Sequence, residues 1–550
     1  MDPFEIFQTS LKTAAAWAAM PEAWLRHCRH LADDVQDLLI DECRAYLAAQ
    51  HNGRIANRSP EDQWWTSSKH LARTSKKLHG LWSGWINRLA QEAPDLTADE
   101  RRRSMFWTRQ LTGAWHPDNC LWLNAQAVKR LLDTNGDSIR MGLRAFIEDL
   151  HARDGLSRLV ADQAFRIGED LAGTPGNVVY RNHLMELIQY CPATPAVYDK
   201  PVVLIQPWIN KYYIFDLQAS NSLVRFLVNK GFSVFITSWK NPSADMRTVS
   251  FENYMLEGAL TAIHVARRIC KVDQVHAAGY CIGGTALASL MAWLHAAKSV
   301  AESPPVADWT LFAALVDFSE PGDLGVFIGR RSIDFIESLM ERDGFLDGRF
   351  ISLAFRLLKS DQLIWRTFTQ SCLLGLTPPR SDVLYWNADA THLPQAVGSF
   401  LLNELYAANR LVGKAPLEVA GRRLDLKRIV EPLYTVGALQ DHICPWPGTF
   451  GTCLHVDSPA RYVLANEGHI AGIVNPPSPR SKKKYWAGNV APAACPRDWL
   501  ASQSVRTGSW WEDWAAWLPA RGDVSVAPPS MGSPAYPVIE PAPGSYVREP

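Results

Sequence analysis

A cysteine between two glycines is the residue of this sequence whose setting points most directly to chemistry. The run "GYCIG", residues 279–283, lies between an apolar strand-like segment and a helical one. It is the G-x-S-x-G pattern with sulfur in place of oxygen, in which the nucleophile occupies a sharp strand-to-helix turn. At such a turn the helix N-terminus favours a thiolate and can stabilise an oxyanion. Cys281 is therefore a candidate nucleophile, although glycines also flank structural cysteines.

An acid and a histidine follow Cys281 in the chain order that this turn leads us to expect. Asp441 closes "PLYTVGALQD", and His469 closes "ARYVLANEGH" 28 residues later, each where a strand should give way to a loop. Asp317, after "LFAALV", is an alternative acid, but Asp441 has the expected late-strand position. We interpret His442 as structural, because adjacent residues point in different directions. The sequence thus predicts Cys281, His469 and Asp441 as catalytic residues.

Two backbone N–H groups are the expected donors to an oxyanion. One belongs to Ile282, directly after the nucleophile. The other should come from the loop after the first long strand, "IQPWINKYYIFDL", near Trp208.

Short β-branched runs alternate with helical segments from about residue 190. Such alternation predicts an α/β fold with a mostly parallel sheet, namely an α/β-hydrolase fold for the segment 166–525. The runs expected to be strands are 201–207, 232–239, 275–280, 311–319, 432–441 and 460–469. About 110 residues separate the fourth run from the fifth, so a cap or lid insertion is expected at about 320–430.

The two ends of the chain differ from this central part. Residues 1–165 read as a helical N-terminal domain, in which Thr97 and Glu100 have capping-box spacing. A further helix around 139–150 has its apolar residues on one face, which is expected to be buried. Residues 526–550 are proline-rich and are expected to form an extended tail, either lying on a surface or disordered.

The amino-acid composition argues against several classes of protein. Lys+Arg and Asp+Glu are balanced at 56 each, which argues against a nucleic-acid partner. The first residues show no secretory leader and no window is apolar enough to span a membrane, so we expect a cytoplasmic protein. Ten cysteines without CxxC pairs argue against a disulfide framework or a metal site, and most are expected to be buried core residues.

Several longer motifs resemble the poly(3-hydroxyalkanoate) synthases, and within them class I, which acts on short-chain substrates. They run in family order over about residues 100–550: "PWINKYYIFDL", "GYCIGGT", "SDQLIW", "YWNADATHLP", "DHICPW", "GHIAGIVNPP", "GSWWEDWAAWL" and "IEPAPGSYV". The resemblance implies a Cys-His-Asp centre on Cys281, His469 and Asp441.

It also implies polymerisation of (R)-3-hydroxyacyl-CoA, such as 3-hydroxybutyryl-CoA, with coenzyme A as leaving group and no cofactor. A homodimer at the surface of polyester granules is the implied assembly, with phasin-like proteins as further partners. A thiol suits this chemistry, because acyl exchange between two sulfurs is nearly balanced in energy. Two alternatives stay open: a Cys-dependent acyl-CoA thioesterase, and a non-catalytic granule-surface protein.

Overall fold

The chain forms two compact units. The computed structural model describes residues 2–51, 60–153, 156–161, 163–296 and 304–549. One unit consists of Met1–Asp162 with Leu353–Arg380, and the other of Gln163–Ser352 with Ser381–Pro550. The insertion expected at about 320–430 is thus divided between the two, because its middle segment belongs to the N-terminal unit.

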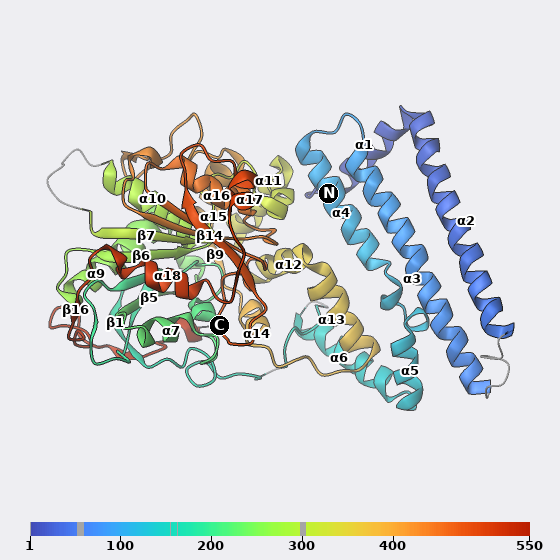
Figure 1. Ribbon diagram of the computed structural model, residues 1–550, viewed down its shortest axis with the longest axis horizontal. Helices are drawn as coiled ribbons and strands as arrows, with labels where there is room; N and C mark the ends of the chain where they lie inside the picture. The colour runs from blue at the N-terminus through green and yellow to red at the C-terminus, as the bar shows by residue number, and fades with distance from the viewer. Residues whose placement is uncertain (1, 52–59, 154–155, 162, 297–303, 550) are drawn as a thin grey trace. The chain divides into compact units, whose positions relative to one another are not determined.

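The N-terminal unit is built of helices, drawn from blue to cyan in Figure 1. They are α1 (Ile6–Ala18), α2 (Pro21–His51), α3 (Pro60–Glu92), α4 (Ala98–Ala114), η1 (Pro117–Asn119), η2 (Leu121–Leu123), α5 (Ala125–Asp133) and α6 (Asp137–Arg153). The inserted segment adds the end of α12 (Gly348–Leu358), η7 (Asp361–Trp365), α13 (Arg366–Phe368) and η8 (Thr369–Leu373). The predicted capping box is confirmed, since Thr97 accepts a hydrogen bond from the Glu100 N–H at the start of α4.

The expectation for the face of α6 was wrong. Leu143, Ile147 and Leu150 are exposed, whereas Ser138 and Asp149 are buried. The helix packs through small residues because its backbone approaches η8 closely: a Cβ on Gly142 would lie 2.0 Å from the Cys372 carbonyl oxygen. The close approach of the α6 and η8 backbones therefore determines which face of α6 is buried, although the apolar residues of α6 lie on a different face.

The second unit contains an eleven-stranded mixed sheet. Its order is β15-β14-β13-β12-β7-β6-β4-β5-β2-β1-β17. The strands are β1 (Gly176–Arg181), β2 (Met185–Tyr190), β4 (Val202–Ile205), β5 (Val234–Trp239), β6 (Val275–Tyr280), β7 (Val306–Phe312), β12 (Leu433–Ala438), β13 (Ala460–Ala465), β14 (Lys484–Val490), β15 (Arg506–Thr507) and β17 (Glu540–Pro541). The six central strands from β5 to β13 are parallel, and the strands at both edges are antiparallel.

Helices connect the parallel strands and lie on both sides of the sheet (Figure 1). The connections include η3 (Tyr212–Phe215), α7 (Leu223–Asn229), η4 (Ala244–Met246), α8 (Phe251–Asn253), η5 (Tyr254–Leu260), α9 (Thr261–Cys270), α10 (Ile282–His295) and α16 (Trp446–His455). Helices α17 (Pro496–Ser502), α18 (Trp511–Trp517), η11 (Pro519–Arg521) and η12 (Tyr546–Arg548) follow later in the chain. The strand order, the six parallel central strands and the helices between them confirm the predicted α/β-hydrolase fold.

The long connection between β7 and β12 supplies the remaining elements of this unit. They are η6 (Gly322–Phe327), α11 (Arg330–Asp343), α14 (Asp382–Ala388), α15 (Gln395–Phe400), η9 (Leu401–Ala407) and η10 (Leu426–Arg428). Two-residue strands pair β8 (Phe345–Leu346) with β9 (Leu393–Pro394) and β10 (Glu418–Val419) with β11 (Arg422–Arg423). A third small pair joins β3 (Val197–Tyr198) to β16 (Ser525–Val526).

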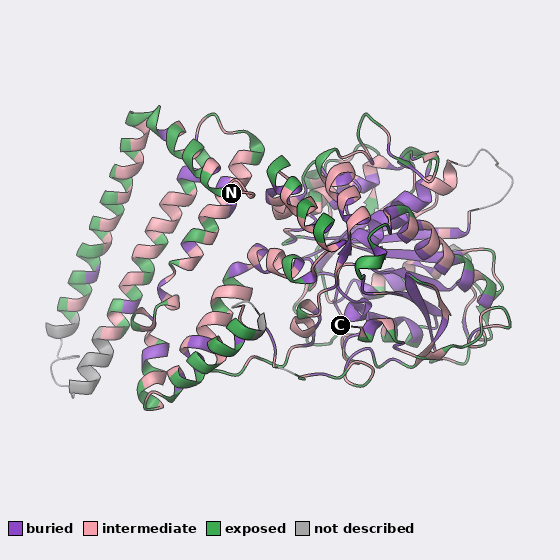
Figure 2. Ribbon diagram, turned by 180° about the vertical axis from the view of Figure 1, so that it is seen from behind, coloured by how far each residue is buried: buried purple, intermediate pink, exposed green. Residues whose placement is uncertain are grey.

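The proline-rich tail is an ordered part of the sheet edge. Its strand β17 pairs with β1, and the buried Glu186 carboxylate accepts hydrogen bonds from the N–H groups of Ser545 and Tyr546 at 3.1 Å. Figure 2 shows that burial concentrates in the sheet and the helices next to it, whereas the helices of the N-terminal unit are largely intermediate or exposed. Among the helices of the described ranges, none has the length and hydropathy needed to cross a membrane.

Candidate active site

Cys281 occupies the turn between β6 and α10. Its backbone lies at φ 51° and ψ −126°, a conformation that residues with a side chain rarely adopt. Cys281 N donates to the Phe312 carbonyl at 2.9 Å, and its own carbonyl accepts from Gly284 N at 2.9 Å. The turn is therefore held by the neighbouring strand on one side and by the first turn of the helix on the other.

The glycines of this turn allow a close approach of helix and sheet. A Cβ on Gly283 would lie 2.6 Å from the carbonyl oxygens of Ile205 and Gln206, at the end of β4. A Cβ on Gly284 would lie 2.5 Å from Ala314 Cβ. Larger residues would push α10 away from the sheet and move Cys281 with it.

The parallel register brings the three predicted residues to one edge of the sheet. Tyr280 pairs with Phe312 across β6 and β7, and Ala438 pairs with Ala465 across β12 and β13. Cys281 directly follows β6, whereas Asp441 and His469 follow β12 and β13 after a few residues. The carboxyl ends of parallel strands meet at the same edge, as is usual for sites in such sheets.

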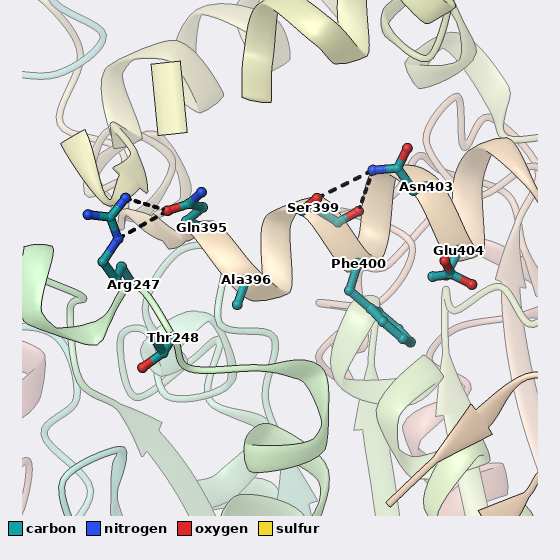
Figure 3. A pocket seen from close by; sticks show the side chains of 8 residues that line it. All are labelled: Arg247, Thr248, Gln395, Ala396, Ser399, Phe400, Asn403 and Glu404. Atoms are coloured by element: carbon teal, nitrogen blue, oxygen red, sulfur yellow. Dashed lines mark hydrogen bonds between the residues drawn. The ribbon is translucent and has the colours of Figure 1, made fainter. Parts of the chain in front are cut away.

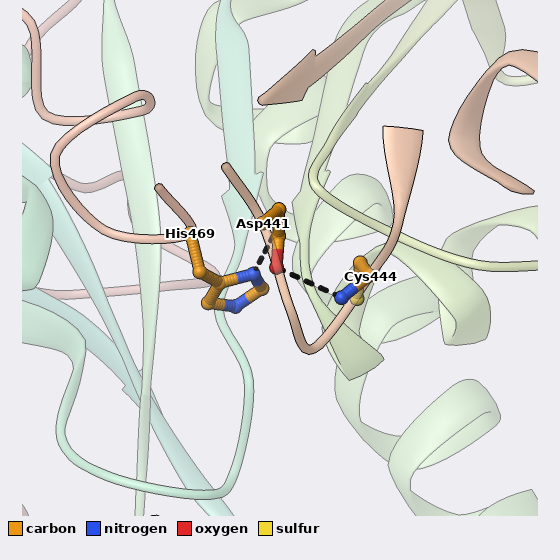
Figure 4. A group of neighbouring side chains, drawn as sticks. All are labelled: Asp441, Cys444 and His469. Atoms are coloured by element: carbon orange, nitrogen blue, oxygen red, sulfur yellow. Dashed lines mark hydrogen bonds and ion pairs between the residues drawn. The ribbon is translucent and has the colours of Figure 1, made fainter. Parts of the chain in front are cut away.

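Asp441 orients the His469 ring and also stabilises the turn on which it lies. Its Oδ2 accepts a hydrogen bond from His469 Nδ1 at 2.7 Å, and its Oδ1 accepts from the N–H groups of Ile443 at 2.8 Å and Cys444 at 2.9 Å. Figure 4 shows this arrangement, with the imidazole and the Cys444 side chain on opposite sides of the carboxylate. The carboxylate is thus saturated by donors and is held in one orientation.

His469 links Asp441 to Cys281. With Nδ1 engaged by Asp441, Nε2 is the ring nitrogen left to interact with Cys281. The imidazole also stacks against the Tyr280 ring at 5.4 Å between centroids. Burial opposes protonation, but the Asp441 and Cys281 charges prevail and raise the pKa of His469 to about 10.

The Cys281 thiol is strongly acidified. The interaction with the Cys444 thiol contributes most; burial opposes the effect, and the His469 cation adds to it, so that the pKa of Cys281 falls to about 5. Together with the raised pKa of His469, this favours a thiolate–imidazolium pair at neutral pH. This is the state in which a thiol attacks acyl groups fastest.

Cys444 is the residue of this site that the sequence analysis missed. Cys444 was one of the cysteines expected to be core residues, and it is buried. The available signal was its position three residues after Asp441, within a turn that folds back over the carboxylate.

Asp317, the alternative acid, lies in a different environment. Its Oδ2 interacts with His455 Nε2 at 3.2 Å, and its Oδ1 accepts from Asn409 Nδ2 at 2.8 Å and Ser319 N at 2.9 Å. His442, adjacent to Asp441, accepts a hydrogen bond from Asp323 N through its backbone carbonyl at 2.8 Å. The structure thus brings together Cys281, His469 and Asp441, and places Asp317 with other partners.

The two expected oxyanion donors belong to neighbouring segments. Ile282 N is at the first residue of α10, and the contact of Gly283 with Gln206 places the loop after β4 against this helix end. In that loop Trp208 stacks on Tyr254 at 4.3 Å and accepts a hydrogen bond from Thr391 Oγ1 at 2.9 Å through its carbonyl. The Trp208 side chain is therefore a packing group, and any contribution to an oxyanion comes from its backbone.

The chain between β7 and β12 covers part of this region. Trp386 Nε1 donates to the Lys211 carbonyl at 2.6 Å, and Asn210 N donates to Thr391 Oγ1 at 2.9 Å. Burial raises the pKa of Tyr406 far above its usual range, and electrostatic interactions with Cys444 and Cys281 add to the effect. The two hydrogen bonds bring side chains of the insertion to the loop after β4.

A separate hollow of about 780 Å³ lies elsewhere in the second unit (Figure 3). Its lining residues are Arg247, Thr248, Gln395, Ala396, Ser399, Phe400, Asn403 and Glu404. Arg247 Nη2 donates to Gln395 Oε1 at 2.8 Å across its rim. Since neither thiol nor His469 lines it, we place the chemistry at the strand ends and not in this hollow.

Donor atoms of Asp441, Cys444 and His469 lie within 4.8 Å of one another. Such a group has the composition of a soft-metal site. However, its imidazole nitrogen and carboxylate oxygen already share a hydrogen bond of 2.7 Å, which a metal would have to break. The geometry fits proton transfer better than metal ligation, so we assign no metal to it.

Comparison with known proteins gives concordant results. Residues 56–227 match the family model described as "Poly-beta-hydroxybutyrate polymerase (PhaC) N-terminus". A poly(3-hydroxyalkanoate) polymerase of Methylorubrum extorquens is 37% identical over 475 residues, covering 86% of this chain and 78% of its own length. A poly(3-hydroxyalkanoate) polymerase subunit of Cupriavidus necator is 34% identical over 528 residues, covering 94% and 88%. Similarity therefore begins before residue 100, where the sequence motifs had placed its start.

Proposed function

This chain belongs to the poly(3-hydroxyalkanoate) polymerase family and is an acyltransferase, and we propose that it polymerises (R)-3-hydroxyacyl-CoA through a thioester on Cys281. The observations that support the proposal most are the hydrogen bond between Asp441 and His469 and the strained turn that holds the Cys281 thiol, whose charge raises the pKa of His469. Ile282 N and Trp208 N are the proposed oxyanion donors.

In the first half-reaction the Cys281 thiolate attacks the thioester carbonyl carbon of the acyl-CoA. The electron pair of the carbonyl moves onto its oxygen, which the two backbone N–H groups stabilise. When the C–S bond to coenzyme A breaks, the leaving thiolate takes the proton that His469 holds. The acyl group is then bound to Cys281, and coenzyme A is a product, so the proposed reaction needs no cofactor.

In the second half-reaction a 3-hydroxyl group attacks the enzyme thioester. Neutral His469 takes the hydroxyl proton, and Asp441 stabilises the imidazolium that forms. An ester C–O bond forms, the C–S bond to Cys281 breaks, and the polyester is longer by one unit. Sulfur suits this cycle because the thioester stays reactive enough to give up its acyl group.

Short-chain acyl groups are the proposed substrates, because the quoted motifs resemble class I enzymes. We also propose a homodimer at the surface of polyester granules, with phasin-like proteins as further partners. Turnover of 3-hydroxybutyryl-CoA against 3-hydroxydecanoyl-CoA tests the substrate class, and sedimentation with and without substrate tests the dimer.

The experiment that decides the proposal compares the wild-type protein with Cys281→Ala on 3-hydroxybutyryl-CoA. We expect the wild type to release coenzyme A and form insoluble polyester, and the variant to release it at least about 10³-fold more slowly. Substantial release by the variant would contradict the covalent mechanism. A soluble hydroxy acid as product would identify a thioesterase, and no release by the wild type would favour a non-catalytic surface protein.

A further inference from the structure

Two thiols from different loops meet in the active site. Cys281 directly follows β6, and Cys444 lies on the turn between β12 and α16, where its donor atom is within 4.8 Å of those of Asp441 and His469. The two thiols shift each other's pKa in opposite directions, that of Cys281 downward and that of Cys444 upward. Cys281 is partly accessible, whereas Cys444 is 5% exposed. Nothing in the mechanism above uses the second thiol.

We propose that Cys444 is a positioning residue for the nucleophile: its thiol donates a hydrogen bond to Cys281 Sγ and holds that sulfur as a thiolate beside His469. This inference rests on the proposed function, because it gives Cys444 a role only if Cys281 is the nucleophile. It adds a fourth member to the Cys-His-Asp series.

The backbone explains why the second thiol stays in place. Cys444 N donates to Asp441 Oδ1 at 2.9 Å, while Asp441 Oδ2 accepts from His469 Nδ1 at 2.7 Å. One carboxylate therefore orients both His469 and the turn that carries Cys444. The Cys444 side chain and the imidazole lie within 4.8 Å of each other, measured between their donor atoms.

The direction of the hydrogen bond follows from the charges around the two sulfurs. The bond to Cys281, together with burial and the Asp441 carboxylate, raises the pKa of Cys444 well above its usual value, so Cys444 keeps its proton. The other titratable groups that face the pair are His469, Asp441, Tyr280 and Tyr406. The pKa of each tyrosine is raised by burial, so both remain neutral donors.

The same bond assists chain elongation. When the 3-hydroxyl oxygen attacks the enzyme thioester, the C–O bond forms and the C–S bond breaks, and the electron pair of that bond returns to Cys281 Sγ. The hydroxyl proton goes to His469, so the departing sulfur needs a different donor. Cys444 supplies one at the atom where negative charge develops.

The test measures alkylation of Cys281 by iodoacetamide from pH 5 to pH 9 in wild type, Cys444→Ala and Cys444→Ser. Trypsin would release residues 272–298, a peptide in which Cys281 is the only cysteine, so mass spectrometry follows this thiol alone. Loss of the donor should lower the thiolate fraction, and we expect Cys444→Ala to react about tenfold more slowly at pH 6 but equally fast at pH 9. Cys444→Ser keeps a donor and should retain at least half the wild-type rate.

Cys453→Ala is the matched control, because Cys453 is a buried thiol in α16 outside the site. It should leave the alkylation profile unchanged. A Cys444→Ala rate within twofold of wild type at pH 6 would overturn the inference, as would a Cys444→Ser rate as slow as that of Cys444→Ala. These outcomes are independent of polymerisation: if Cys281→Ala still released coenzyme A, the proposed function would fail whatever the alkylation profile.

Discussion

Two aspartate–histidine pairs in the same unit differ in what surrounds them. Asp441 and His469 are 2.7 Å apart, with side-chain exposures of 0% and 9%, whereas Asp317 and His455 are 3.2 Å apart and 25% and 33% exposed. Both aspartates follow strands of the central sheet. Of the two imidazoles, His469 is the one whose pKa is raised by a neighbouring thiol, that of Cys281.

The second pair is occupied with holding chain segments together. Asp317 also accepts from Asn409 Nδ2 and Ser319 N, and with His455 it joins the insertion to the end of α16. These partners lower the pKa of Asp317 far below its usual range, His455 most of all. The proposed catalytic role therefore belongs to Asp441 and His469, which are the more buried pair and lie beside the Cys281 turn.

Removing the aspartate charge from each pair in turn should give the largest difference in the rate of coenzyme A release between two variants. We expect Asp441→Asn to reduce the rate of coenzyme A release by roughly 10²–10⁴-fold, because an amide cannot stabilise the imidazolium and favours the wrong tautomer. Asp317→Asn should stay within about threefold of wild type, since the contacts that it weakens are partly exposed and do not involve His469. Steady-state rates on 3-hydroxybutyryl-CoA measure both, and the reverse ranking would make Asp317 the acid.

The pH dependence of activity distinguishes two states of the free enzyme: an ion pair of Cys281 and His469, and a neutral Cys281 thiol. With pKa values of about 5 for Cys281 and about 10 for His469, kcat/KM should be nearly constant from pH 6 to pH 9. Below about pH 5 the thiolate is protonated and the rate should fall tenfold per pH unit. A rate that instead rises steadily up to pH 9, the region where an ordinary thiol ionises, would show that no ion pair exists before substrate binds.

His276 and its two aspartate partners form a buried cluster that contributes to stability. The Cys281 thiol is not part of this cluster. Buried His276 lies 2.8 Å from both Asp308 Oδ2 and Asp523 Oδ2. Burial disfavours the charged ring, but the two carboxylates outweigh it and raise the pKa of His276 to about 9. The free energy that this charge contributes is complete below about pH 6.5 and is lost as the pH rises through about 9.

Urea unfolding at pH 7 and pH 10 should detect this loss. We expect the unfolding free energy of the wild type to fall by about 1–3 kcal/mol more than that of His276→Gln between these pH values. Activity of His276→Gln at pH 7 should remain within about twofold of wild type. Equal pH dependence of stability in the two proteins would show that the ring is neutral in the fold.

The sequence predicts the strands that carry the site better than the sheet edges. β4, β6, β12 and β13 fall within predicted runs because each is a short apolar segment that ends in loop residues. β7 begins at Val306, earlier than the predicted run from residue 311, which includes loop residues after the strand. The edge strands β1, β2 and β14 were missed because polar residues interrupt their apolar pattern.

The order of residues along the chain was enough to predict which three side chains form the candidate site. The G-x-C-x-G turn and the later Asp441 and His469 fix which strand ends must meet. The position of Cys444 beside Asp441 and His469 was not predictable, since it depends on how two loops fold over one carboxylate. For the same reason the small-residue packing of α6 opposed its hydrophobic pattern, because the partner segment is distant in sequence.

The central claim is that the acyl group passes through Cys281. The most direct test is to mix the protein with 3-hydroxybutyryl-CoA, quench in acid within one turnover, and measure the mass of the tryptic peptide 272–298. We expect this peptide to carry one or more 3-hydroxybutyryl units in the wild type and none in Cys281→Ala. Release of coenzyme A with an unmodified Cys281 peptide at every time point would contradict the account.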